Sequence, residues 1–319
     1  MMRENQSAKG RKGPAVRIQK VAIIGKGAVG LLYGSMIERA LGPGAVEFVM
    51  DDERFARHAA DVVTVNGEAC GIATVPASKA RVADAVILTI KTTGLAAALD
   101  TMAAVVGPQT RIASLCNGIR SERAIAERYG WERTVLSVAQ GMDAVFIGDA
   151  MTYAHTGEIR FGAAEGTAPG VVEDLADLYA RAGISHTVEE DIVRRMWTKL
   201  MLNVGVNQTC MVYGGTYGTV LEPGGEQMRC FVAAMREVRA VAEVEGVLLT
   251  EADLSQMVAL MAGLDPDGMP SMAQDRVNGK RTEVEEFAGT IRELGRSHGI
   301  LTPTNDWLYE RVRQIEAGF

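Results

Sequence analysis

The sequence predicts an α/β domain with a mainly parallel sheet, followed by an all-α domain. The chain has 319 residues, of which 47% are hydrophobic, and this is enough apolar material for two cores. Short β-rich runs alternate with helical patterns over residues 20–187, as in consecutive βαβ units. Long helical patterns replace the strand signals after that, so residues 188–319 are predicted to form the second domain.

Residues 1–19 precede the first apolar run and are rich in Lys, Arg, Gly and polar residues. They are predicted to form a disordered arm. The run Val21–Ile24 has only the length of a strand, which is too short for the core of a signal peptide. No window reaches the roughly eighteen consecutive apolar residues of a membrane helix. We therefore expect a cytoplasmic protein.

The strands of the first domain are identified from apolar composition and from turn residues. The parallel part of the sheet is predicted from Val21–Ile24, Val46–Met50, Ala85–Ile90 and Ile112–Leu115. Between Val62 and Val75 the residues alternate around Asn66-Gly67, a dipeptide that closes tight hairpins, and this predicts an inserted β-hairpin.

The last part of the sheet is predicted to be antiparallel. Thr134–Ala139, Ala144–Ile147 and Glu158–Phe161 are strand-like, and the Gly-containing turns between them leave no room for helices. A helix over Gly170–Ala182 and a short strand near Ile184 complete the domain.

The second domain shows only helical periodicity. Helices are predicted at roughly 189–212, 225–246, 251–262 and 280–297. The turn-forming run Asp265–Gly268 separates the last two. The stretch from Pro270 to Arg281 is expected to be a polar turn that leads into an acidic helix start.

A glycine-rich loop lies between the first strand and the first helix of the chain. Its sequence is Gly25-Lys26-Gly27-Ala28-Val29-Gly30, which is G-x-G-x-x-G in the strand, turn and helix setting that this motif requires. In such loops the first glycine makes the turn, the second admits pyrophosphate to the backbone, and the third lets helix and strand pack closely. The motif predicts a Rossmann-type dinucleotide-binding domain, the alternative being an ordinary tight turn.

The residue after the second strand bears on which dinucleotide is bound. Asp51 stands there, and a carboxylate at this position accepts hydrogen bonds from the ribose hydroxyls of NAD but repels the 2′-phosphate of NADP. Arg54 and Arg57 follow closely and could compensate that charge. The sequence leaves both cofactors open.

One helix of the second domain carries a polar stripe. The segment from Arg194 to Thr209 is apolar nearly all round, yet Lys199, Asn203 and Asn207 recur at i, i+4 and i+8 and so share a face. Each polar residue alone would be expected at a surface or bonded to a neighbouring loop. Three in register favour a cleft, because an unpaired buried lysine is costly.

Composition argues against several classes of partner. The formal charge is −7, which gives no general attraction to nucleic acid or to anionic membranes. The four cysteines form no C-x-x-C pair, and the four histidines lack the spacing of metal ligands, so we predict free thiols and no metal. Apolar residues on the carboxy-terminal helices could form a homodimer interface.

Several separated motifs, taken together, resemble the ketopantoate reductase (2-dehydropantoate 2-reductase) family, from Lys20 to about Gln314. The family pattern comprises a G-x-G-A-V/I-G loop, a Lys-Thr strand end, an Asn-Gly turn, a K-x-x-x-N-x-x-x-N helix, and S-M-x-Q-D followed by Thr-Glu. Here these are Gly25–Gly30, Lys91-Thr92, Asn117-Gly118, Lys199/Asn203/Asn207, Ser271–Asp275 and Thr282-Glu283.

The resemblance implies reduction of a small 2-oxo acid, ketopantoate, by NADPH in pantothenate biosynthesis, with the substrate between a Rossmann domain and a helical domain. It implies that Lys199 is the general acid and that Glu283 is its partner and a ligand of the substrate hydroxyl. It assigns the substrate to Asn203, Asn207, Ser271 and Asn117, and the cofactor cleft to Lys91 and Asn117.

The chain departs from the family pattern at two positions. Asp51 stands where many NADP-using members have arginine, and Pro270 stands where some have serine. Two other functions fit the same residues: reduction of another branched or aromatic 2-oxo acid, and a non-catalytic dinucleotide sensor. The presence of both Lys199 and Glu283 argues against the sensor.

Overall fold

The computed structural model describes residues 17–319, and two compact units are distinguished by their internal contacts. Unit 1 contains residues 17–90, 94–116 and 121–192, and unit 2 contains residues 91–93, 117–120 and 193–319. The division falls after Ile192, a few residues beyond the predicted boundary, because β12 (His186–Val188) still pairs with the sheet of unit 1. Most of the predicted arm lies outside the described residues, but Ile18 is fully buried in a core.

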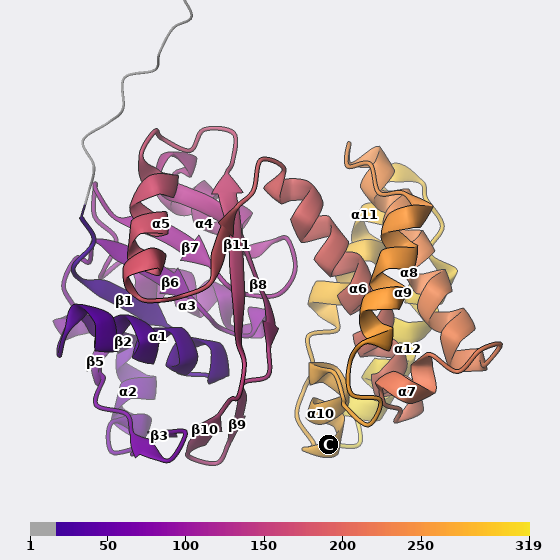
Figure 1. The fold of residues 1–319 in the computed structure, drawn as a ribbon, viewed down its shortest axis with the longest axis horizontal. Helices are drawn as coiled ribbons and strands as arrows, with labels where there is room; N and C mark the ends of the chain where they lie inside the picture. Colours follow the sequence, from indigo (N-terminus) through magenta and orange to yellow (C-terminus); the bar gives the residue numbers. More distant parts are fainter. Residues whose placement is uncertain (1–16) are drawn as a thin grey trace, which may run out of the picture. The chain divides into compact units, whose positions relative to one another are not determined.

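Unit 1 is built on an eight-stranded sheet (Figure 1). The strand order is β12-β11-β8-β7-β6-β1-β2-β5, and every neighbouring pair is parallel except β8 and β11. The other strands are β1 (Val21–Ile24), β2 (Val46–Met50), β5 (Ala73–Pro76), β6 (Ala85–Leu88), β7 (Arg111–Ser114), β8 (Thr134–Met142) and β11 (Thr156–Ala163). The predicted mainly parallel sheet is confirmed, and of its predicted antiparallel last part the structure has the pair β8 and β11.

Helices cover both faces of this sheet, because side chains of a strand alternate between its faces. Val21 and Ile23 of β1 share a core with α1 (Ala28–Leu41) and α5 (Val171–Arg181). Ala22 and Ile24 belong to a second core, with residues of α3 (Leu95–Met102) and α4 (Ser121–Tyr129). The remaining helical segments are α2 (Asp52–His58), η1 (Ala77–Lys79), η2 (Thr92–Gly94) and η3 (Trp131–Arg133).

A second, four-stranded sheet has the order β4-β3-β10-β9. Its strands are β3 (Thr64–Val65), β4 (Glu68–Ala69), β9 (Val145–Ile147) and β10 (Ala150–Thr152). The predicted hairpin at Asn66-Gly67 is confirmed: β3 and β4 pair antiparallel, and both turn residues have positive φ, 48° and 84°.

Two strand assignments made from the sequence were wrong. The hairpin does not extend to Val75, because β5 leaves it and pairs with β2 at the edge of the main sheet. Ala144–Ile147 does not join the main sheet either, since β9 pairs with β10 in the second sheet. Alternation and turn residues show that a strand exists, but not which distant strand it pairs with.

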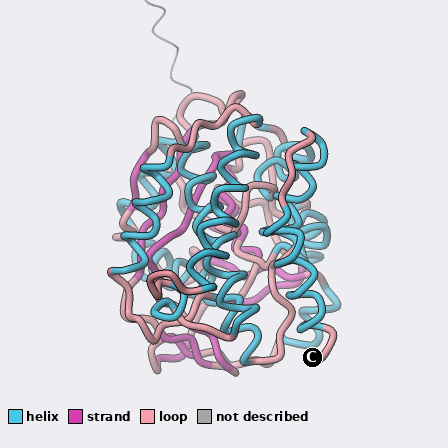
Figure 2. The backbone as a smooth tube through the Cα atoms, turned by 90° about the vertical axis from the view of Figure 1, so that its right-hand side faces the viewer, coloured by secondary structure: helices cyan, strands magenta, loops and turns pink. Residues whose placement is uncertain are grey.

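The described part of unit 2 contains helices and no strands, as predicted (Figure 2). A single apolar core joins the long helices, with Leu200, Phe231, Met257 and Phe287 among its buried residues. The helices are α6 (Ile192–Tyr213), α7 (Tyr217–Val220), α8 (Glu226–Val244), α9 (Glu251–Ala262), α10 (Ser271–Val277), the π-helix η4 (Glu285–Gly289), α11 (Thr290–His298) and α12 (Pro303–Glu316).

The sequence interpretation missed part of this unit. The polar turn predicted after Pro270 contains α10, and the final helix α12 was not predicted. The helix predicted at 280–297 begins later, with one π-helical turn at Glu285. Helices such as α10 that are one or two turns long carry too little periodicity to stand out from loops.

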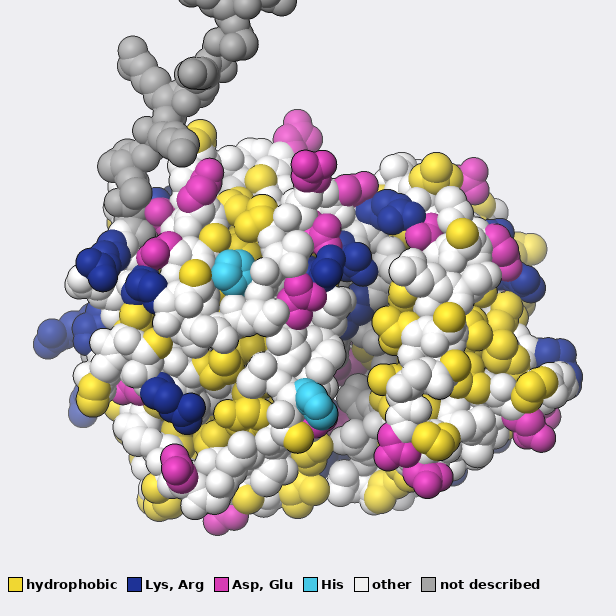
Figure 3. Space-filling view, in the orientation of Figure 1, with side chains coloured by type: hydrophobic (Ala, Val, Ile, Leu, Met, Phe, Trp, Pro, Cys, Tyr) yellow, Lys and Arg dark blue, Asp and Glu magenta, His cyan; other side chains and the backbone are white. Residues whose placement is uncertain are grey.

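No helix among residues 17–319 is long and apolar enough to cross a membrane. On the face drawn in Figure 3, acidic and basic side chains are interspersed over both units instead of being gathered by sign.

Candidate active site

The glycine-rich loop of unit 1 has the geometry that close approach of a phosphate requires. Gly25 has φ of +116°, a conformation that favours glycine. A Cβ at Gly30 would lie 2.1 Å from the carbonyl oxygen of Gly25, so helix α1 packs against the loop only because this side chain is absent. A Cβ at Gly27 would meet nothing within 4 Å, which leaves open space beside that backbone.

The start of α1 is free to bind an anion. Gly27 is its N-cap and supplies no side-chain acceptor, and the first turn carries no acidic residue. The first N–H groups of a helix lack internal partners, and its dipole attracts negative charge there. Together with the glycine geometry, this loop fits the pyrophosphate of a dinucleotide.

The non-glycine residues of the loop contact neighbouring elements of unit 1. Lys26 donates a hydrogen bond from Nζ to Oγ1 of Thr74 in β5, at 3.1 Å, and the ammonium lies 5.9 Å from the ring centroid of Phe48. Ala28 and Val29 open the helix and contact the core of unit 1.

Asp51 lies at the end of β2 and is the N-cap of α2. Its Oδ1 accepts a hydrogen bond from the backbone N–H of Arg54, at 2.8 Å. The cap holds the carboxylate at the carboxyl end of the strand, where the ribose of a dinucleotide lies in this fold class. Arg54 and Arg57 are exposed, and Arg57 pairs with Glu53 on its own helix.

In unit 2, three predicted site residues form one hydrogen-bonded chain. Lys199 lies on α6 and donates from Nζ to Oδ1 of Asn117, at 3.1 Å. The same amide donates from Nδ2 to Oε2 of Glu283, at 2.8 Å. Asn117 thus bridges the ammonium and the carboxylate, and both partners fix the orientation of its amide group.

The position of Glu283 is set by the segment around it. The preceding Thr282 donates from its backbone N–H and its hydroxyl to Oε1 of Glu316, at 2.7 and 2.6 Å. The following turn is π-helical, and Gln208 of α6 accepts the backbone N–H of Ala288 through Oε1, at 3.1 Å. Such π-turns occur frequently at functional sites. Glu283 itself is 6% exposed.

The other polar residues of α6 form a second group. Asn207 is 5% exposed, and its Oδ1 accepts from the Ser271 hydroxyl at 3.0 Å and from the Met272 N–H at 3.1 Å. Its Nδ2 donates to Oδ1 of Asn203, at 3.4 Å. Because Pro270 offers α10 no side-chain cap, Asn207 acts as a tertiary cap for that helix.

The two groups are connected through α6 itself. Lys199 and Asn203 are four residues apart, which places them on the same face about one turn apart. The structure therefore brings Lys199, Asn117 and Glu283 together directly, and Asn203 to the next turn. Asn207 has both ends of its amide engaged, which favours a supporting role over direct contact with a substrate.

Lys91 has a partner that the sequence interpretation did not assign. Its Nζ donates to both oxygens of Asp275, at 2.7 and 2.8 Å, and to the Arg281 carbonyl at 3.3 Å. Burial raises the pKa of Asp275, and the Lys91 and Lys280 ammonium groups act in the opposite direction. Asp275 belongs to the S-M-x-Q-D motif, so the motif identified this residue, but it did not predict that Lys91 would be its partner.

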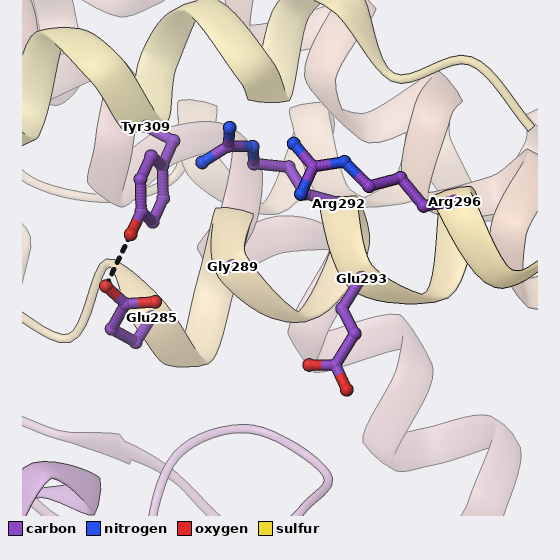
Figure 4. A pocket seen from close by; sticks show the side chains of 6 residues that line it. All are labelled: Glu285, Gly289, Arg292, Glu293, Arg296 and Tyr309. Carbon is purple, nitrogen blue, oxygen red and sulfur yellow. Dashed lines mark hydrogen bonds between the residues drawn. The ribbon is translucent and has the colours of Figure 1, made fainter.

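A surface pocket lies elsewhere in unit 2, among α11, α12 and the π-helix (Figure 4). Both of its cations are paired: Arg292 donates to Asp306 at 2.6 Å, pairs with Glu310 and stacks on Tyr309, with 3.9 Å between Cζ and the ring centroid. Arg296 pairs with the same Asp306 carboxylate, at 3.5 Å. Glu285 accepts the Tyr309 hydroxyl at 2.6 Å. This pocket offers no unpaired cation for the carboxylate of a substrate.

No cluster of three or more His, Cys, Asp or Glu residues in the described chain, 17–319, could hold a metal ion. All four cysteines are free; Cys116 and Cys210 are buried, whereas Cys70 and Cys230 are half-buried.

Comparison with known proteins places both units in one family. Residues 21–166 match the family described as "Ketopantoate reductase PanE/ApbA", and residues 191–316 match "Ketopantoate reductase PanE/ApbA C terminal". A 2-dehydropantoate 2-reductase of Caulobacter vibrioides is 31% identical over 296 residues, which cover 89% of this chain and 95% of the relative.

Solved structures agree with this. A PanE/ApbA family ketopantoate reductase from Ralstonia eutropha JMP134 has a TM-score of 0.81 and 25% identity, covering 94% of this chain and 99% of that one. A D-mandelate dehydrogenase with NADH and anilino(oxo)acetate has a TM-score of 0.82 at 21% identity, covering 94% and 98%, and shares the fold. This chain belongs to the ketopantoate reductase family.

Proposed function

We propose that this protein is an NAD(P)H-dependent 2-dehydropantoate 2-reductase, which reduces ketopantoate to pantoate for pantothenate and coenzyme A biosynthesis. The observation that carries the proposal is the hydrogen-bonded chain Lys199–Asn117–Glu283. The Asn117 amide accepts from the Lys199 ammonium and donates to the buried Glu283 carboxylate. The curated relative from Caulobacter vibrioides has this activity in its name and aligns over most of both chains.

The glycine loop after β1 would hold the cofactor, with the N–H groups at the start of α1 on its pyrophosphate. When bound, the reduced nicotinamide supplies the hydride that adds to the ketone carbon.

The remaining chemistry is done by residues of unit 2. Charge develops on the ketone oxygen as the hydride arrives, and the Lys199 ammonium stabilises it and donates the proton. Asn117 accepts from the ammonium and so directs it. We assign Glu283 the role of accepting a hydrogen bond from a substrate hydroxyl, and Asn203 and Ser271 that of binding polar groups of the substrate. The hydrogen bonds of Asn207 to both residues support this assignment.

Initial rates with several 2-oxo acids test this proposal. We expect kcat/KM for ketopantoate to exceed that for unhydroxylated branched 2-oxo acids and for phenylglyoxylate by at least about tenfold, because only ketopantoate offers a hydroxyl to Glu283. A higher kcat/KM for an aromatic or another branched 2-oxo acid would show that this acid, not ketopantoate, is the substrate of the same type of reduction. Absence of turnover with every acid and both cofactors, while NADPH or NADH still binds, would support a dinucleotide sensor instead.

The identity of the cofactor gives a second prediction. We expect NADH to bind at least as tightly as NADPH, because the Asp51 carboxylate would face the 2′-phosphate; this repulsion corresponds to about 1–3 kcal/mol. Asp51→Asn should shift the affinity ratio toward NADPH by roughly tenfold or more while keeping the cap of α2, since asparagine caps helices as well as aspartate does.

Competing titrations of the two reduced cofactors measure this ratio. Asp52→Asn is the matched control, because Asp52 is the adjacent carboxylate and its Oδ1 accepts the Ser78 N–H at 3.1 Å. The Asp51 hypothesis fails if NADPH binds about tenfold tighter than NADH and Asp51→Asn leaves that ratio unchanged.

A further inference from the structure

Glu286 is a buried carboxyl group next to the proposed site that the mechanism above does not use. It is 4% exposed, and its Oε1 has no hydrogen-bond partner among residues 17–319. It lies on the π-helical turn, one turn after Glu283, and its backbone N–H donates to the Glu283 carbonyl at 2.9 Å.

The carboxyl group of Glu286 packs against the Asn117-Gly118 turn. A Cβ on Gly118 would lie 1.9 Å from Oε1, so the carboxyl occupies the space that any other residue would need there. Gly118 also has φ of +92°, which favours glycine. The turn is therefore held at two points: Glu283 accepts the side chain of Asn117, and Glu286 packs on the adjacent main chain.

Burial disfavours a negative charge on Glu286 more than the surrounding donors favour it. Burial raises its pKa to about 7, opposed first by the Arg120 guanidinium. The Glu283 carboxylate raises this pKa further, and the backbone N–H groups of Ile119 and Arg120 lower it. Arg120 also pairs with Glu293 and is partly exposed, so its charge is shared with a second carboxylate and with solvent.

We propose that Glu286 is a positioning residue that acts through the Asn117-Gly118 turn, and that its uncharged form is the one that supports binding of an anionic 2-oxo acid. The inference rests on the proposed function. An ionised Glu286 adds a negative charge next to the Asn117-Gly118 turn. This charge repels the carboxylate of a 2-oxo acid bound nearby.

The direction of the pH effect follows from this arrangement. Because burial raises the pKa of Glu286 to about 7, its carboxyl group loses a proton as the pH rises through that value. A further negative charge then lies near the carboxylate of the substrate. At an effective dielectric constant near 20, one like charge several ångströms away weakens binding by on the order of tenfold.

The test compares KM for ketopantoate between about pH 6 and about pH 8.5, at saturating cofactor, in the wild type and in Glu286→Gln. Glutamine keeps the shape but cannot ionise. We expect KM of the wild type to rise on the order of tenfold across this range, and KM of Glu286→Gln to stay at the low-pH value. Glu286→Ala should lower kcat at every pH, because the turn loses its support, and Glu286→Gln should restore kcat.

Glu285→Gln is the matched control. Glu285 is the neighbouring glutamate on the same π-helical turn, but it is exposed and its side chain points to the Tyr309 hydroxyl (Figure 4). Its variant should follow the pH profile of the wild type. A pH-dependent KM in Glu286→Gln equal to that of the wild type, or the same flattening in Glu285→Gln, overturns the role of Glu286.

Binding of oxamate, an unreactive 2-oxo acid analogue, separates this inference from the proposed function. Calorimetric titrations of the cofactor-loaded enzyme should show oxamate affinity falling on the order of tenfold with pH in the wild type and remaining constant in Glu286→Gln. Normal turnover with pH-independent KM and oxamate affinity overturns the inference alone. Failure to bind oxamate at any pH, together with absence of turnover, overturns the proposed function and this role with it.

Discussion

Replacing Lys199 by alanine is expected to lower kcat by on the order of a hundredfold to ten-thousandfold, the range for a lost general acid, while the cofactor still binds. In the proposed mechanism, removal of the ammonium leaves the developing alkoxide without a proton donor. It also removes the hydrogen-bond donor of Asn117 Oδ1, so the amide loses one of the two hydrogen bonds that orient it. Single-turnover rates and cofactor titrations together measure both effects.

Two further variants of Lys199 separate chemistry from packing. Lys199→Met keeps most of the length of the side chain without its charge and should lose as much kcat as Lys199→Ala. Lys199→Arg keeps the charge but holds its proton more tightly. Compared with Lys199→Ala, it should regain substrate binding in the presence of cofactor but recover little of kcat. If Lys199→Met turns over at the wild-type rate, Lys199 takes no part in the proton transfer.

Much of the fold could be predicted from local signals. The glycine loop after β1, the turn at Asn66-Gly67 and the parallel strands of the first domain all depend on short-range sequence, and the structure has them. The pairing partners of β5 and β9 depend on contacts with strands distant in sequence, and periodicity alone does not carry this information.

The candidate site shows the same division. Helical spacing was sufficient to place Lys199, Asn203 and Asn207 on one face of α6. Spacing could not show that the Asn207 amide would be engaged by the start of α10, because that contact joins residues 64 positions apart. Nor could it show that Asn117, which is 82 positions from Lys199, would accept its hydrogen bond.

The acidic run after Thr282 was the least informative part of the sequence. It reads as an ordinary helix start, in which carboxylates favour the first turn. In the structure one of its members, Glu285, is exposed, whereas Glu286 is buried against Gly118. Adjacent residues of a helix point in different directions, and the π-helical turn that carries both was not predicted from the sequence.

The bridging role of Asn117 gives the last expected result: Asn117→Asp should lower kcat/KM on the order of a hundredfold at alkaline pH, since a hydrogen bond to a buried charged group is replaced by repulsion. One oxygen of the new carboxylate can still accept a hydrogen bond from Lys199. The other oxygen takes the place of the Asn117 Nδ2 group, which donates to Oε2 of Glu283 at 2.8 Å. Two carboxylates in contact cannot both ionise at ordinary pH, so the pKa of the pair rises.

The pH dependence of this variant follows from the shared proton. As the pH falls through the raised pKa, one of the two carboxyl groups regains a proton and can donate again, so kcat/KM should partly recover. Asn117→Ala, which has no titratable group, should stay low at every pH. Asn278→Asp is the matched control, because Asn278 is the exposed C-cap of α10 and its amide donates to the Gln274 carbonyl of that helix, at 2.8 Å. A profile for Asn117→Asp that matches Asn278→Asp, with kcat/KM within about twofold of the wild type, would show that the amide does not link the ammonium to the carboxylate during turnover.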